Sequence, residues 1–223
     1  QKEIKMMKKM LAFVLALCMT LALIGCGNAK QPENEDQSSG ESKRVEPLAS
    51  SVDVSNVTEA TLAVSFDKSS LHTDGDTMTL DMKVYDFEQF DAAEVSQLKE
   101  GDVIVVDGKE ITVASIDTTN GVEINGGFDQ ENGVSLATLD GGVLCAVGAD
   151  DAKSYYEVGT VTLPVSETCV LTDSADLNAG EKTVAAAELA AFLTNDTAAF
   201  QPGNTQVTVS GGQITAISRV YMP

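Results

Sequence analysis

Residues 103–116 read Val-Ile-Val-Val-Asp-Gly-Lys-Glu-Ile-Thr-Val-Ala-Ser-Ile. Two runs rich in β-branched residues flank the pair Asp107-Gly108. This pattern is typical of a type I′ turn, because both central residues of that turn need positive φ. The stretch therefore predicts a β-hairpin in which residues 103–106 pair with residues 110–116.

The chain on both sides of this hairpin keeps a period of two, which indicates half-buried strands. Met78, Leu80, Met82 and Val84 alternate with polar residues, and residues 62–66 alternate in the same way. A turn-rich loop is expected between them, at residues 68–76. Further strands are predicted at residues 122–124, 133–139, 143–147, 155–164, 205–210 and 213–221, the last two forming a second hairpin around Gly211-Gly212.

One segment breaks this period and predicts a helix. Residues 184–193 read Val-Ala-Ala-Ala-Glu-Leu-Ala-Ala-Phe-Leu, with apolar side chains roughly on one face and Thr183 at the N-cap position. A shorter helix is expected at residues 92–98. Many short antiparallel strands and hairpins with one packed helix near 184–193 predict a mainly β fold, either a barrel or a sandwich.

The N-terminal part has a different composition. The pair Lys8-Lys9 precedes an uncharged, mostly apolar run that extends from Met10 to Cys26. A basic head followed by such a run is typical of an export signal. The run closes with Leu23, Ile24, Gly25 and Cys26, a long aliphatic residue, a second aliphatic residue, glycine and cysteine.

These residues resemble the lipobox of bacterial prolipoproteins. The resemblance covers residues 6–26 and implies that the Cys26 thiol receives a diacylglyceryl group. It also implies that a lipoprotein signal peptidase recognises Leu23, Ile24 and Gly25 and cleaves before Cys26. The alternative is a plain transmembrane anchor, for which about 17 residues would be at the short limit.

Three regions are therefore expected. Residues 1–25 are a lipoprotein signal peptide, of which residues 1–5 precede the expected start at Met6 or Met7. Residues 26–50 are the lipidated cysteine and a disordered tether, since they are polar and offer little to bury. Residues 51–223 form an acidic, mostly β exported domain, held at the extracytoplasmic side of the cell membrane by its lipid.

The negative net charge of the chain limits the classes of molecule that it can bind. The whole chain carries a formal charge of −20. Residues 51–223 contain seven basic and 28 acidic residues, which repel phosphate backbones and anionic surfaces. Nucleic acid is therefore not expected as a partner. The membrane, reached through the lipid, and an envelope protein are the expected partners.

Acidic loops are the one indication of a metal site. Asp74, Asp76 and Asp81 form one cluster, and a second cluster consists of Asp173, Asp176 and Glu181. Clustered carboxylates suit Ca²⁺, although neither cluster has EF-hand spacing. Aspartate is also common in turns for local reasons, so Ca²⁺ stays an alternative and no cofactor is predicted.

The remaining reactive side chains predict no catalytic residue. The one histidine, His72, is expected to be a solvated loop residue. Cys145 and Cys169 could form a disulfide in an exported domain or be two small buried side chains. The hypothesis is a membrane-anchored lipoprotein with a non-catalytic binding domain at the cell envelope. The alternatives are a Ca²⁺-dependent structural surface domain and a carboxylate-based envelope hydrolase.

Overall fold

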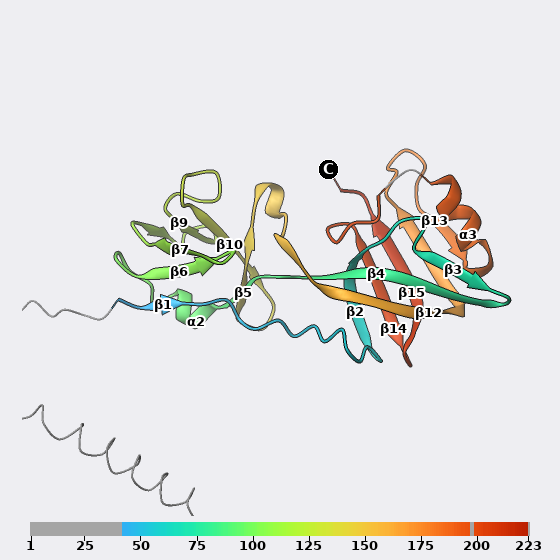
Figure 1. The fold of residues 1–223 in the computed structure, drawn as a ribbon. Helices are drawn as coiled ribbons and strands as arrows, with labels where there is room; N and C mark the ends of the chain where they lie inside the picture. Colours follow the sequence, from blue (N-terminus) through green and yellow to red (C-terminus); the bar gives the residue numbers. More distant parts are fainter. Residues whose placement is uncertain (1–41, 197–198, 223) are drawn as a thin grey trace, which may run out of the picture. The chain divides into compact units, whose positions relative to one another are not determined.

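The computed structural model describes residues 42–196 and 199–222, and these residues form a mainly β structure, as predicted (Figure 1). Within this part of the chain, no helix is long and apolar enough to cross a membrane. The expected signal peptide and the lipobox at Leu23–Cys26 lie outside the described residues.

The largest sheet has seven strands and closes on itself. Its hydrogen-bonded order is β13-β12-β15-β14-β2-β4-β3, and β12 also pairs with β4, which makes a ring of five strands. The strands are β2 (Ala60–Ser65), β3 (Leu71–Asp74), β4 (Thr77–Phe87), β12 (Tyr155–Ser174), β13 (Lys182–Ala185), β14 (Thr205–Ser210) and β15 (Gln213–Val220).

Strand β12 makes the closure possible. It has 20 residues, more than the ten expected at 155–164. Its first half pairs antiparallel with β4, and its second half pairs with β13 and, in parallel, with β15. The pairing register shifts between Glu157 and Gly159 and again between Val165 and Val170, and such irregularities bend a strand.

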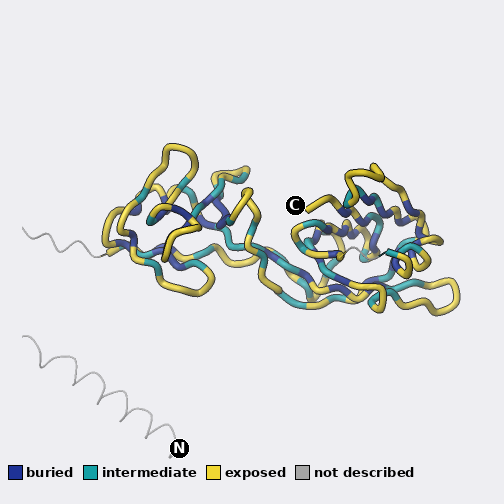
Figure 2. The backbone as a smooth tube through the Cα atoms, turned by 90° about the horizontal axis from the view of Figure 1, so that it is seen from above, coloured by how far each residue is buried: buried dark blue, intermediate teal, exposed yellow. Residues whose placement is uncertain are grey.

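Alternation along the strands builds the core inside this sheet (Figure 2). In β4, the predicted apolar positions Leu80, Met82 and Val84 are at most 2% exposed, while their neighbours are more exposed. Helix α3 (Ala186–Asn195) covers the core with Leu189 and Leu193. Its N-cap is Ala185 rather than the expected Thr183, because residues 182–185 extend the sheet as β13.

A second lobe is inserted between two paired strands. The chain leaves β4, forms residues 88–154, here called the inserted lobe, and returns as β12. Its elements are β5 (Gln89–Asp91), α2 (Ala92–Val95), β6 (Val103–Val106), β7 (Lys109–Thr112), β8 (Ile116–Asp117), β9 (Val122–Ile124), β10 (Val134–Leu139), β11 (Val143–Val147) and η1 (Ala149–Asp151).

The inserted lobe has its own hydrophobic core. Phe90, Ile104, Val113 and Ile124 are fully buried there, in a cluster distinct from the core of the large sheet. The predicted hairpin is confirmed as β6 and β7, with Asp107 and the following glycine at positive φ, but its second strand ends at Thr112 rather than at residue 116. The described part of residues 51–223 therefore contains two hydrophobic cores, one in the large sheet and one in the inserted lobe.

Two further expectations are corrected. The tether was expected to extend to residue 50, but β1 (Arg44–Val45) pairs with β6 and buries Val45 completely, so the folded part begins earlier. The loop at 68–76 contains β3, which pairs antiparallel with β4 and is the last strand of the sheet on that side. The short helix expected at 92–98 ends at Val95.

Candidate binding groove

A groove of about 950 Å³ lies against the large sheet. Its walls come from β4, β12, the residues after β2, the end of α3 and residues 199–201. Ser65, Ser70, Thr160 and Thr162 contribute hydroxyl groups to this lining. Ligand sites commonly have volumes of about 300–1,000 Å³ and combine apolar walls with a few polar groups.

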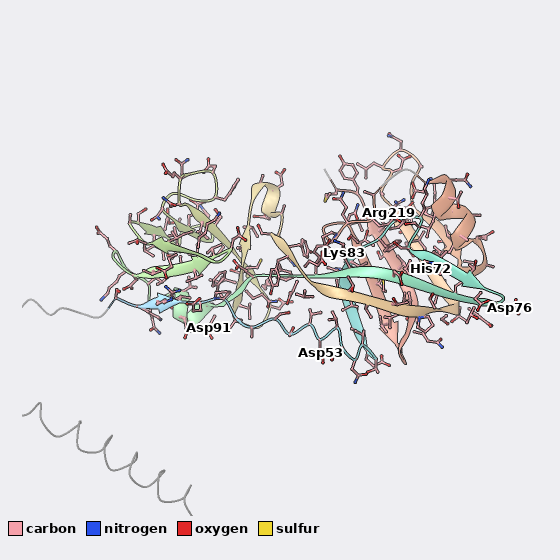
Figure 3. The ribbon with its side chains drawn as sticks, in the orientation of Figure 1. Asp53, His72, Asp76, Lys83, Asp91 and Arg219 are labelled. Carbon is pink, nitrogen blue, oxygen red and sulfur yellow. The ribbon has the colours of Figure 1, made fainter. Side chains whose placement is uncertain are left out.

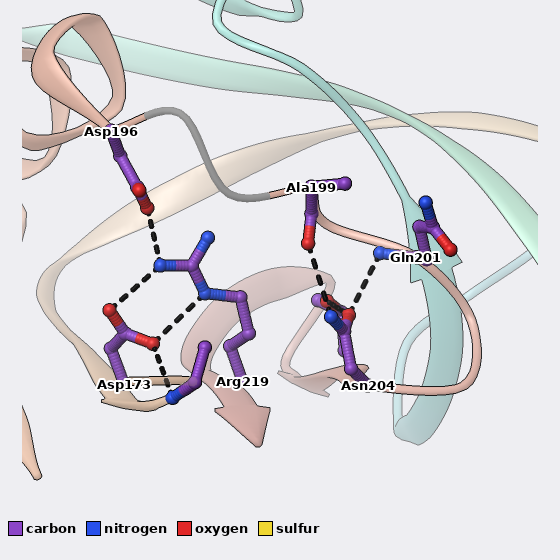
Figure 4. A network of polar contacts seen from close by, with 8 residues as sticks. Asp173, Asp196, Ala199, Gln201, Asn204 and Arg219 are labelled. Carbon is purple, nitrogen blue, oxygen red and sulfur yellow. Dashed lines mark hydrogen bonds and ion pairs between the residues drawn. The ribbon is translucent and has the colours of Figure 1, made fainter. Parts of the chain in front are cut away.

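Two phenylalanines join the walls of the groove. Phe66 follows β2, Phe200 follows α3, and the two form an isolated β-bridge. Their rings stack with centroids 4.4 Å apart and an angle of 21° between planes. Asn204 holds the adjoining segment, because its side chain accepts from the Gln201 N–H and donates to the Ala199 carbonyl (Figure 4).

Arg219 lies beneath this aromatic pair and is 2% exposed. Its guanidinium carbon is 4.2 Å from the centroid of the Phe200 ring, a cation–π geometry. Nε and Nη2 donate to the two carboxylate oxygens of Asp173 at 2.9 and 2.7 Å, and Nη2 also donates to Asp196 (Figure 4). Arg219 thus links β15, β12 and the groove wall after α3.

The carboxylate of Asp173 is kept charged by this network. Burial by itself would raise the pKa of Asp173, but the hydrogen bond and charge of Arg219, with a bond from the Ala175 N–H, outweigh it and lower the pKa. Asp173 was expected to be a candidate Ca²⁺ ligand. Both of its oxygens serve a buried arginine instead.

Asp81 and Thr162 also line the groove, and His72 contacts Asp81 from outside this lining. His72, labelled in Figure 3, belongs to β3 rather than to a loop. Its Nε2 lies 2.8 Å from Asp81 Oδ2. Thr162 Oγ1 donates to Asp81 Oδ1 at 2.6 Å. The Thr162 hydrogen bond, and then that of His72, lowers the pKa of Asp81. Asp81 is thereby engaged by neighbouring side chains.

Two lysines line the groove, and they differ in whether they form an ion pair. Lys83 donates to Glu157 at 2.8 Å across the β4–β12 pair. Lys68 is exposed and has no ion-pair partner among residues 42–196 and 199–222. Lys68 is therefore a cation that a bound partner can approach.

The predicted Ca²⁺ clusters do not assemble in the described part of the chain. There, no three histidine, cysteine, aspartate or glutamate side chains are arranged to hold a metal ion. Asp74 ends β3, and Asp76 points into solvent at the β3–β4 turn (Figure 3). Asp176 accepts hydrogen bonds from two backbone N–H groups of its own turn, and Glu181 accepts from Ser174 Oγ at 3.4 Å.

Cys145 and Cys169 are free and buried. The disulfide between them is therefore wrong, and they are the two small buried side chains of the alternative. Cys145 lies in β11 of the inserted lobe, and Cys169 lies in β12 within the core of the large sheet. Both side chains are at most 2% exposed, as is common for a free cysteine that packs as a small apolar group.

Several aspartates have a pKa below the ordinary value for aspartate. For Asp53, Asp67, Asp81, Asp117 and Asp173, neighbouring donors lower the pKa. A glycoside hydrolase needs one carboxyl group with a raised pKa to act as general acid. These five aspartates do not suit that role.

Sequence reasoning missed Arg219 and the stacked phenylalanines. One signal was present, because Ile217 and Arg219 occupy successive inward positions of β15 and Arg219 is charged. An arginine in the apolar register of a strand indicates a buried ion pair. The identity of its partners depends on the fold.

No protein family, curated protein or solved structure matches this chain in sequence or fold comparisons.

Proposed function

We propose that the chain is a lipid-anchored, extracytoplasmic lipoprotein whose folded part binds a component of the cell envelope without performing chemistry. The proposed export and lipid anchoring rest on Lys8-Lys9, the apolar run and Leu23–Cys26. The binding role rests on one observation, the groove beside the Phe66–Phe200 pair with Lys68 exposed in it.

The composition of the groove supports binding over catalysis. Its aspartates are engaged by Thr162, by Arg219 or by serines of their own turn, so their oxygens already have donors. An apolar wall and one accessible lysine remain for a partner. Such a surface suits a neutral or weakly anionic envelope component, and the acidic field of the domain disfavours strongly anionic ones.

Lipidation is tested by substituting Cys26→Ser in a bacterial host supplied with labelled palmitate. We expect the label to be lost and the precursor to accumulate, because serine lacks the thiol that accepts the lipid. Cys18→Ser is the matched control, since Cys18 lies in the same apolar run and should leave labelling unchanged. Labelling of the Cys26→Ser chain would exclude the proposed anchor.

The groove is tested by placing a photo-crosslinking residue at Lys68 in living cells. The control position is Lys109, whose side chain is 77% exposed on β7. We expect a discrete crosslinked species from position 68 and none of the same mass from position 109. Identical products from the two positions, or no product from position 68, would argue against the groove as the binding site.

A further inference from the structure

The segment that enters the folded part is bound to the inserted lobe like a peptide ligand. Residues 43–48, here called the strap, lie beside α2 and β6 (Figure 1). Arg44 and Val45 add in parallel to the edge of β6, opposite Val103 and Ile104. The Val103 N–H donates to the Lys43 carbonyl at 2.8 Å, and the Leu48 N–H donates to the Gln89 carbonyl at 2.7 Å.

A buried carboxylate fixes the start of the strap. Asp102 is 1% exposed, and its Oδ1 accepts from the Lys43 N–H at 2.8 Å while Oδ2 accepts from the Lys99 N–H at 3.0 Å. Lys43 Nζ donates to the Glu94 carbonyl and to Gln97 Oε1. The strap thus binds through backbone groups, as in β-strand addition, and a basic side chain meets acceptors of α2 and the turn after it.

Specificity comes from the next two residues. The Arg44 guanidinium donates to Glu110 on β7 at 2.6 Å. Val45 is fully buried among the core residues of the inserted lobe. Lys43 and Arg44 are basic, whereas the domain that receives them is strongly acidic. The contacts of the site therefore match a basic pair followed by a β-branched apolar residue in an extended conformation.

We propose that this edge of the inserted lobe is a binding site for extended basic segments, which the chain's own strap occupies as an internal ligand. A partner protein with a Lys-Arg-Val-like extended segment competes with the strap for the site. Displacement would free residues 43–48 and lengthen the linker between Cys26 and the folded part. The site itself does not depend on lipidation or on the groove, so its test is independent of both.

The test uses the full chain with a specific protease site inserted between Leu48 and Ala49. The protein is folded first and cut afterwards, so that folding does not depend on the variant. The probe is a fluorescent peptide of residues 42–48, added to cut and uncut protein. We expect binding to the cut protein and little to the uncut one, because the attached strap competes at high effective concentration.

Two variant peptides probe specificity. Val45→Asp should weaken binding by roughly tenfold or more, because it places a charge in the apolar site. Leu48→Asp is the matched control, since Leu48 is 45% exposed and its contact is through the backbone, and its affinity should stay within about twofold. Higher salt should weaken binding of the native peptide, because Arg44 meets Glu110 at an exposed position.

Three results would overturn the proposal. In the first, the cut protein keeps its own strap bound and takes up no labelled peptide. It could lose the strap, stay folded by circular dichroism and bind no peptide. It could also bind the native and Val45→Asp peptides equally, which would mean that the apolar position does not select the ligand.

Discussion

At the scale of single residues, Arg219 brings two carboxylates and an aromatic ring around one buried charge. A buried guanidinium loses its hydration, and only close carboxylates and an aromatic face can compensate for this loss. Asp173, Asp196 and Phe200 provide these contacts. Arg219 therefore joins three segments of the chain at the base of the groove.

Substitution Arg219→Met should lower the free energy of unfolding by about 3–5 kcal/mol, because Asp173 would remain buried without its counter-charge. Lys83→Met is the control. Lys83 forms an exposed pair with Glu157, and its loss should cost less than about 1 kcal/mol. Urea denaturation of the two variants measures both values, and equal losses would contradict a structural role for the buried pair.

The cysteines allow a second prediction at this scale. Cys145 and Cys169 are at most 2% exposed, and burial raises the pKa of Cys169 to about 11. In a Cys18→Ser, Cys26→Ser background, we expect neither thiol to react with iodoacetamide at pH 7.5 until the protein is unfolded, when both should react. A denatured protein without reactive thiols would indicate a disulfide and contradict the structure.

At the scale of elements, the loop between β9 and β10 depends on close backbone packing. Asn125 adopts positive φ, and its side chain accepts from the Ala114 N–H at 2.7 Å and donates to the Thr112 carbonyl. A Cβ atom on Gly133 would lie 1.8 Å from the Gly127 carbonyl oxygen. This loop therefore tolerates no side chain at position 133.

We expect Gly133→Ala to destabilise the protein by about 1–3 kcal/mol, since the backbone of residue 127 must move to avoid the clash. Gly148→Ala is the matched control in the same lobe. The nearest atom to a Cβ there is the Ala152 carbonyl oxygen, at 3.9 Å, so the change should be about 0.5 kcal/mol or less. Thermal melts compare the two, and a tolerated Gly133→Ala would show that the loop can rearrange.

At the scale of the whole molecule, acid is expected to unfold the protein through its bonded carboxylates. For Asp102, burial would raise the pKa, but backbone hydrogen bonds from Lys43 and Lys99 lower it, and Arg219 lowers the pKa of Asp173. Lowered pKa values contribute stability that is complete above the unfolded value, about pH 4, and is lost as pH falls through the folded values.

Denaturation at stepped pH tests this expectation. Between pH 7 and about 5, partial neutralisation of the acidic surface relieves repulsion, so stability should hold or rise. Below about pH 4, it should fall steeply as Asp102 and Asp173 become protonated. Constant stability down to pH 2 would contradict the role of these two carboxylates.

The sequence by itself determined the mainly β class, the hairpin around Asp107-Gly108 and the strand of Met78–Val84. It also indicated a helix at residues 184–193, although Val184 and Ala185 belong to β13 and the helix begins at Ala186. These features are local, because side-chain alternation and turn chemistry involve residues within a few positions of each other.

Only the tertiary structure decided the remaining features. The β4–β12 pair that closes the sheet, the docking of Val45 and the partners of Arg219 join residues far apart in the chain, with Asp173 and Arg219 separated by 46 positions. A period of two shows which side of a strand is buried, but not which strand lies beside it. Pairing over such distances depends on loop closure and burial across the whole fold, which no local pattern contains.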